Sequence, residues 1–232
     1  MLQVHLKIES ELASGSILRT SISMVYLLVF PIPDDALQKV YTAKAESVAL
    51  TAKSIVRDFF GGGRKGDVGR RRVRRSLSEG DGEKNSRLKI GYLSADFQEH
   101  PVGLLFASVP SLHNKSAIFD TACLSLQSPS RGGKPDRIAD ALRESCGEWQ
   151  DLQGESLGEA YGKIERIKSD ILVEMNGYTQ HARPELVASS TSPLRISLLG
   201  FAHSLMGDFI DFIATDALAS PPELWQVNMS GV

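Results

Sequence analysis

The second half of the chain alternates between short apolar runs and longer stretches in which apolar residues recur at helical spacing. The short runs are almost continuously apolar, which indicates strands that are buried on both faces. Strands of this kind, separated by helices, form a parallel sheet with helices over its faces. The expected fold class is therefore α/β, a Rossmann-like parallel sheet covered by helices. The expected strands are 88–94, 119–126, 148–152, 170–177, 195–201 and 211–216, and the expected helices are 101–114, 135–146, 156–168 and 183–190.

The first 60 residues are expected to form a helical segment in front of this sheet domain. Residues 34–60 carry apolar side chains near helical spacing, and Asp34 and Asp35 can cap the start of one amphipathic helix. The apolar run 22–32 spans 11 residues, fewer than the ~20 that cross a bilayer, which indicates a buried segment and no membrane anchor.

Residues 61–87 are expected to be a disordered basic linker between the helical segment and the sheet domain, 88–232. Glycine, arginine and serine dominate this stretch and apolar residues nearly vanish, so it cannot form a core. Its run "GRRRVRR", 69–75, has the composition of a nuclear localisation signal or a nucleic-acid patch. A solvated basic linker is the interpretation we favour.

The composition of the chain limits the size of its core and the kinds of partner and metal site that are expected. Hydrophobic residues make up 42% of 232 residues, enough for one good core, and the net charge of -2 argues for neither a nucleic-acid nor a membrane partner. The two cysteines, Cys123 and Cys146, lack metal-ligand or redox-motif spacing. They are expected to be reduced, buried thiols in a cytosolic or nuclear protein, and no metal site is expected.

Polar candidates follow the first, second, fourth and fifth expected strands. Ligands of open parallel sheets bind at the carboxyl ends of the strands, where loops lead into helices. A lone His-Pro pair is often no more than a helix entry, with proline in the first turn. Convergence of several polar groups on one edge favours a site instead. The residues expected to face this edge are His100, Asn176, Tyr178, Thr179, His181 and His203.

Three separated motifs in collinear order resemble one family. The runs "LKIGYLSADFQEHPVGLL", "DILVEMNGYTQHARPELVASSTSPLRISLLGF" and "DFIATDALASPPEL" resemble the first catalytic lobe of nucleocytoplasmic protein O-linked N-acetylglucosamine transferases, glycosyltransferase family 41, which also includes SPINDLY-like proteins. The resemblance covers about residues 86–224. It implies one lobe of a GT-B enzyme that transfers N-acetylglucosamine from UDP-N-acetylglucosamine to Ser or Thr hydroxyls of acceptor proteins, with inversion and without a metal or other cofactor. It also implies a cytoplasmic or nuclear location, and neither a membrane nor a specific nucleic-acid partner is expected.

The same resemblance assigns roles to individual residues. His100 falls on the family's active-site histidine, a base or an acceptor-orienting group; an imidazole suits either role at neutral pH. The family's "NGYT" stretch lies beside the acceptor peptide and the reacting sugar, and its "LGY" stretch helps to wall the N-acetyl group of the donor. The residues expected to bind substrate on these grounds are Asn176, Tyr178, Thr179, Leu199, Gly200 and Phe201.

Two departures from the family pattern shape the alternatives. Where the family typically has "GYPGTSG", residues 200–207 are "GFAHSLMG", which is expected to place bulk near the sugar. Only 16 residues follow Asp216, so these 232 residues are expected to lack the UDP-binding second lobe, to bind UDP poorly and to be inactive alone. The alternatives are a protein O-fucosyltransferase of the SPINDLY type and a non-catalytic peptide-binding module derived from this lobe.

Overall fold

The computed structural model describes residues 34–61, 87–127 and 135–221. In this part of the chain six strands form one parallel sheet in the order β3-β2-β1-β4-β5-β6. The predicted parallel, helix-covered sheet is confirmed, and every predicted strand is present within one to three residues of its expected bounds. The strands are β1 Leu88–Ser94, β2 Phe119–Ser125, β3 Glu148–Asp151, β4 Ile171–Glu174, β5 Leu194–Leu198 and β6 Phe212–Ala214.

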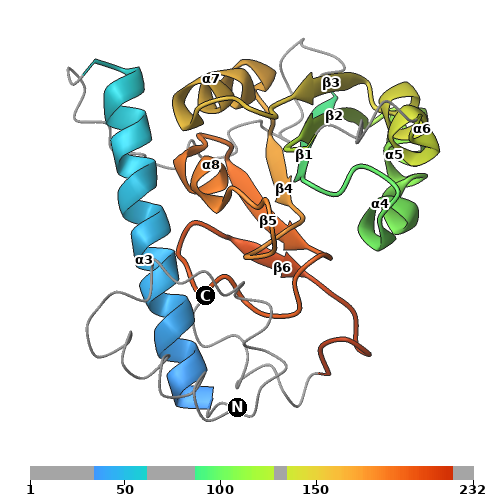
Figure 1. The fold of residues 1–232 in the computed structure, drawn as a ribbon. Helices are drawn as coiled ribbons and strands as arrows, with labels where there is room; N and C mark the ends of the chain where they lie inside the picture. Colours follow the sequence, from blue (N-terminus) through green and yellow to red (C-terminus); the bar gives the residue numbers. More distant parts are fainter. Residues whose placement is uncertain (1–33, 62–86, 128–134, 222–232) are drawn as a thin grey trace, which may run out of the picture.

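Helices cover both faces of the sheet, as Figure 1 shows. Side chains of the central strands alternate between two hydrophobic clusters, one on each face, so both faces are buried. This two-sided burial is the reason that the strands are continuously apolar. The helices on one side are α4 Pro101–Phe106, α5 Val109–Lys115 and α6 Arg137–Ser145, and those on the other are α7 Leu157–Ile167 and α8 Pro184–Ser189.

The expected helix over residues 101–114 is two helices, α4 and α5. Pro110 occupies the first turn of α5. Proline has no N–H to donate to the preceding turn, so a continuous helix cannot run through this position. The break allows α4 to point away from the end of β1 while α5 returns to the start of β2.

The helix predicted at 34–60 is α3, Asp34–Phe59. It packs against α7 and α8, and its inward side chains Tyr41, Ala45, Val48 and Ile55 belong to the same hydrophobic cluster as one face of the sheet. The helix is thus part of the core of the sheet domain. The rest of the expected helical segment, 1–33, and the expected linker over 62–86 lie outside the described residues.

The two cysteines form a disulfide, so the prediction of reduced thiols was wrong. Cys123 lies in β2 and Cys146 directly follows α6, and their Cα atoms are 6.0 Å apart, a separation typical of disulfides. The pairing arises because α6 carries the chain from β2 back to β3, which pairs with β2 from Ala122 onward. This proximity depends on the crossover and is not visible in the spacing of the cysteines.

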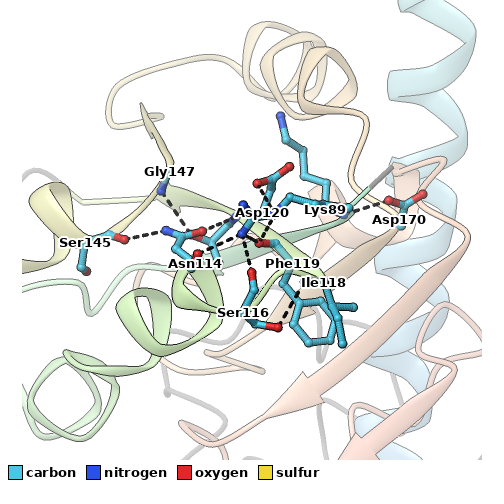
Figure 2. Close-up of polar contacts among 11 residues, drawn as sticks. Lys89, Asn114, Ser116, Ile118, Phe119, Asp120, Ser145, Gly147 and Asp170 are labelled. Carbon is cyan, nitrogen blue, oxygen red and sulfur yellow. Dashed lines mark hydrogen bonds and ion pairs between the residues drawn. The ribbon is translucent and has the colours of Figure 1, made fainter. Parts of the chain in front are cut away.

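Polar side chains close the amino-terminal edge of the sheet. The guanidinium of Arg87 donates to the carbonyl oxygens of Asn114, Ser116 and Phe119 and pairs with Asp120. Figure 2 shows the neighbouring contacts, in which Asn114 donates to the Ser145 carbonyl and the Lys89 N–H donates to Asp170. These groups hydrogen-bond one another across the strand starts. The polar groups that follow strands gather at the opposite edge.

The packing of α3 generates the first prediction. Ile55 is 7% exposed within the core cluster, whereas Leu50 on the same helix is 67% exposed. We expect Ile55→Ala to lower the free energy of unfolding by about 2–4 kcal/mol, because truncation leaves a cavity, and Leu50→Ala to lower it by less than about 1 kcal/mol. Urea denaturation of the two variants measures the difference, and equal losses would show that α3 does not share the core.

Candidate functional site

The loops after β1 and β4 meet at the centre of the carboxyl edge. β1 and β4 are neighbours, but the chain leaves β1 toward β2 and leaves β4 toward β5, in opposite directions along the sheet. Such a reversal point is where open parallel sheets bind ligands, because the two connections diverge and leave a crevice. The loop after β1 ends at His100, and the loop after β4 contains the "NGYT" stretch.

Asn176 joins these two loops. Its side chain is fully buried; Oδ1 accepts the Ala95 N–H at 2.7 Å, and Nδ2 donates to Asp96 Oδ2 at 2.7 Å and to Thr179 Oγ1 at 3.2 Å. The hydrogen-bonding groups of the amide are thus occupied by the protein itself. In this structure Asn176 positions both loops, and the expected direct contact with substrate stays a prediction.

His100 stands at the entrance to α4, half-exposed. It is the N-cap of that helix, and its Nδ1 accepts the Val102 N–H at 3.3 Å. The same Nδ1 lies 3.7 Å from Asp96 Oδ1. The structure thus shows the helix-entry role of the His-Pro pair and places the ring beside a carboxylate at the reversal point, while a catalytic role of His100 stays a prediction.

Further contacts hold the loop that carries His100. The Glu99 N–H donates to Asp136 Oδ2 at 2.8 Å, and Asp136 also caps the start of α6. Gly103 in α4 packs so closely on the loop that a Cβ would overlap the Gln98 carbonyl oxygen. The loop is thus fixed from α6, from α4 and, through Asn176, from β4.

A buried carboxylate supports the "NGYT" turn from below. Glu174, the last residue of β4, is 2% exposed, and its oxygens accept the N–H groups of Asn176 and Gly177 at 2.7–2.8 Å. Burial raises the pKa of Glu174 from its ordinary 4.5 to about 7, against the lowering effect of the two N–H donors. Sequence reasoning missed this residue because it lies inside an apolar strand pattern.

Tyr178 points into the core and not toward the edge. Its hydroxyl donates to the Leu205 carbonyl at 2.7 Å, and its ring stacks on Tyr41 of α3 at 6.0 Å between centroids. His203 also stacks on Tyr41, at 4.5 Å, and Phe201 meets Tyr41 edge-on. The expectation that Tyr178 and His203 face the edge was therefore wrong, because α3 supplies an aromatic partner that attracts both rings inward.

The bulk expected in the loop 200–207 also turns inward. Leu205 is buried, and Met206 packs against the same core cluster as α3. Leu199 remains partly exposed at the end of β5, next to Gly200. Gly200 has a φ of +56°, and a Cβ there would overlap the Met175 carbonyl oxygen, so this loop packs directly against the start of the "NGYT" turn.

Burial raises the pKa of the Asp96 carboxyl, and His100, the hydrogen bond from Asn176 and the exposed His181 partly oppose this shift. His181 also lines a cavity of about 440 Å³ with Gln127, Gln153, Glu155 and Arg183. Asp96 was not predicted as a site residue, although its position four residues before His100 and two residues after the end of β1 could have revealed it. Thr179 is half-buried beside Asn176, and within the described ranges no group of three potential metal ligands is present.

Close packing at Gly200 generates a second prediction. Gly154 has a similarly positive φ of +74° but open space around it. We expect Gly154→Ala to cost about 1–2 kcal/mol of unfolding free energy for its backbone conformation alone, and Gly200→Ala about 3 kcal/mol or more because a carbonyl oxygen blocks the methyl group. Denaturant unfolding compares the two; an equal cost would contradict the close contact between the two loops.

Burial of Glu174 generates a third prediction. Between pH 4.5 and 7 the folded chain keeps a proton on Glu174 that the unfolded chain has released, so the free energy of unfolding falls as pH rises through this window. The interval between 4.5 and 7 corresponds to about 3 kcal/mol. Glu174→Gln should remove this part of the pH dependence, whereas Glu99→Gln on the exposed loop should retain it. Urea titrations at pH 4.5 to 8 test this; an unchanged slope in Glu174→Gln would exclude Glu174 as its source.

Comparisons with known proteins converge on one family. The model of Glycosyl transferase family 41 matches residues 74–229. The UDP-N-acetylglucosamine–peptide N-acetylglucosaminyltransferase of Caenorhabditis elegans is 35% identical over 143 residues, which are 61% of this chain and 12% of that protein. The probable enzyme of the same description named SEC, from Arabidopsis thaliana, is 32% identical over 135 residues, 58% of this chain and 13% of that protein. Plant proteins named SPINDLY match at 26–28% identity.

A solved structure of a mutant of the Thermobaculum terrenum O-GlcNAc transferase has the same fold. It superposes with a TM-score of 0.56 at 20% sequence identity, over 94% of this chain and 40% of that chain.

The chain spans 12–13% of the length of the first two relatives. Within the described residues, no helix is both long enough and apolar enough to span a membrane. Because the family model includes all six strands and both loops that meet at Asn176, the chain belongs to glycosyltransferase family 41.

Proposed function

We propose that this chain provides the acceptor-activating lobe of a protein O-GlcNAc transferase. In this proposal N-acetylglucosamine passes from UDP-N-acetylglucosamine to a Ser or Thr hydroxyl of an acceptor protein, with inversion and without a metal. The observation that supports it most is the position of His100, beside Asp96 at the reversal point of a family 41 lobe. The names of the first two relatives support the donor and the peptide acceptor.

The proposed reaction assigns His100 to the attacking hydroxyl. As the hydroxyl oxygen bonds to the anomeric carbon, its proton moves to an imidazole nitrogen, and the bond between that carbon and the UDP oxygen breaks on the opposite face. The half-exposed ring of His100 is accessible to an acceptor at this edge. General-base assistance of this kind contributes roughly 10²–10⁴-fold to the rate.

The surrounding residues would shape the sugar site and hold it rigid. Leu199 and Gly200 lie at the end of β5, against the start of the "NGYT" turn, where they would wall the N-acetyl group. Asn176 and Tyr178 would act indirectly, since their polar groups bind the two adjoining loops. Thr179, half-buried beside Asn176, is the member of the stretch that remains a candidate for contact with the acceptor.

The diphosphate of the donor needs cations or N–H donors as the UDP leaves. Arg183, which lines the cavity at this edge, already donates to the carbonyl oxygens of Leu152 and Glu155. We therefore assign the described lobe to activation of the acceptor hydroxyl. We assign the contacts to the diphosphate to a portion of such an enzyme that lies outside the segment matched here.

Neither alternative function is favoured. The proteins named SPINDLY match at lower identity than the first two relatives, and the "NGYT" and "HP" spellings argue in the same direction. The non-catalytic module was inferred from two features, the expected lack of the second lobe and bulk near the sugar. The second is weakened, because Leu205 is buried and His203 stacks on Tyr41. These two bulky side chains of the loop 200–207 therefore pack against the protein itself.

We propose the cytoplasm or nucleus as the location of the protein, with acceptor proteins and a nucleotide sugar as its partners. The family resemblance supports this location. The Cys123–Cys146 disulfide argues against it, because disulfides are more typical of oxidising compartments.

A graft tests the proposed function. Residues 74–229 replace the aligned segment of the Caenorhabditis elegans relative, and transfer from UDP-N-acetylglucosamine to an acceptor peptide is measured. We expect the graft to be active and His100→Ala to lower its kcat by roughly 10²–10⁴-fold with little change in UDP affinity. Lys115→Ala, at the exposed end of α5, serves as the control and should leave kcat unchanged.

Each alternative has its own outcome in this experiment. Transfer of fucose from a GDP donor, and not of N-acetylglucosamine, would support the SPINDLY-type reading. A graft that binds UDP and peptide but transfers neither sugar would support the non-catalytic module. Full activity of His100→Ala would show that the histidine only caps α4.

A further inference from the structure

The Nδ1 atom of His100 has two neighbours, and each of them requires a different protonation state of this nitrogen. The Val102 N–H, at 3.3 Å, requires an unprotonated Nδ1 that accepts a hydrogen bond. Asp96 Oδ1, at 3.7 Å, requires a protonated Nδ1 that donates one. The first distance is longer than a typical N–H hydrogen bond, and the second becomes one if the two atoms approach by about 0.5–1 Å.

The choice between these partners decides what the other ring nitrogen can do. A neutral imidazole carries one proton, so an accepting Nδ1 leaves the proton on Nε2, and that nitrogen then cannot take a proton from a hydroxyl. A donating Nδ1 leaves Nε2 with a free lone pair. Only the second tautomer serves a general base.

Asp96 is held in the orientation that favours the second tautomer. Its side chain is 16% exposed, its Oδ2 accepts from Asn176 Nδ2 at 2.7 Å, and its backbone N–H donates to Ser94 Oγ at 3.0 Å. Because Asn176 is itself fixed by the Ala95 N–H, the carboxylate cannot turn away freely, and Oδ1 remains directed at His100. In the described part of the chain, His100 is the residue that the structure places against Oδ1.

We propose that Asp96 is the positioning residue of this site: its Oδ1 accepts the Nδ1 proton of His100 and so keeps Nε2 available as the base. This inference rests on the proposed function for its catalytic meaning, although the tautomer itself is independent of any activity. A base that is oriented by a third group is a recurrent arrangement in catalytic sites. The hydrogen bond from the Val102 N–H to Nδ1 is then the contact that competes with Asp96 for this nitrogen.

His181 is the other imidazole that faces Asp96, and it lies on the exposed side of the loop after β4. Glu174, beneath the same loop, adds negative charge near the carboxylate when it is ionised. Asn176 donates to Oδ2, and the oxygen that faces His100 is Oδ1. The four-residue spacing along one tight loop and the 3.7 Å separation favour His100.

The test is the tautomer of His100 in this chain, measured by long-range ¹H–¹⁵N correlation spectroscopy on ¹⁵N-histidine-labelled protein at alkaline pH. His100→Gln assigns the resonance among the five histidines. Asp96→Asn is expected to lower the ratio of Nδ1–H to Nε2–H about tenfold, because a charge-assisted acceptor is lost. To keep its bond from Asn176, the introduced amide must direct its NH₂ group at His100, which favours an accepting Nδ1.

Glu99→Gln is the matched control, since it removes the same charge from the same loop on an exposed side chain whose polar atoms make no bond to His100. It should leave the ratio unchanged. Asp96→Ala is a second variant, for use if Asp96→Asn lowers the melting temperature. It removes the acceptor without introducing an NH₂ group, and it should also lower the ratio. A ratio that is the same in wild type and in both Asp96 variants, or that changes equally in Glu99→Gln, would overturn the proposal.

The failure of this inference is distinguishable from the failure of the proposed function. An unchanged tautomer with an active, His100-dependent graft would exclude Asp96 and leave the transferase function intact. A changed tautomer in Asp96→Asn together with an inactive graft would support the Asp96–His100 contact but contradict its proposed role in catalysis. Activity of an Asp96→Asn graft, lowered in kcat with the same UDP affinity, completes the link between the two.

Discussion

The buried amide of Asn176 is the interaction on which the rest of the edge depends. An unpaired polar group inside a protein costs free energy, so a fully buried amide persists only where partners surround it. Here those partners come from two loops that are 80 residues apart in the chain. Their convergence places Asp96, and through it His100, at the reversal point of the sheet. The geometry of the candidate base is therefore a consequence of satisfying one amide.

A second buried polar group lies beneath the first. Glu174 accepts the N–H groups that open the "NGYT" turn, so the turn is fixed from below by a carboxylate and from the side by Asp96. Burial is the main cause that raises the pKa of Glu174, and the negative charge of Asp96 raises it further. A protonated Glu174 leaves the negative charge of the site on Asp96. That is the group that faces the histidines.

The sequence predicted the sheet because continuous apolar runs have one physical explanation, burial on both faces. It also located His100 and Asn176 at the carboxyl edge, since the loops that follow the strands of a parallel sheet all lie at that edge. It could not predict the inward turn of Tyr178 and His203, because that depends on Tyr41, more than 130 residues earlier in the chain. The Cys123–Cys146 pair was missed for the same reason, as its proximity arises from a crossover.

The packing of α3 links the first described helix to the loops at the carboxyl edge of the sheet. Tyr41 contacts rings that belong to the loops after β4 and after β5, and the hydroxyl of Tyr178 binds the second loop through the Leu205 carbonyl. These two loops also meet where Gly200 packs on Met175. A displacement of α3 would therefore shift both loops together. The loop that carries His100 is held from α6 by Asp136 and is joined to the loop after β4 by Asn176. Asn176 is therefore the residue through which the packing of α3 can reach the candidate base.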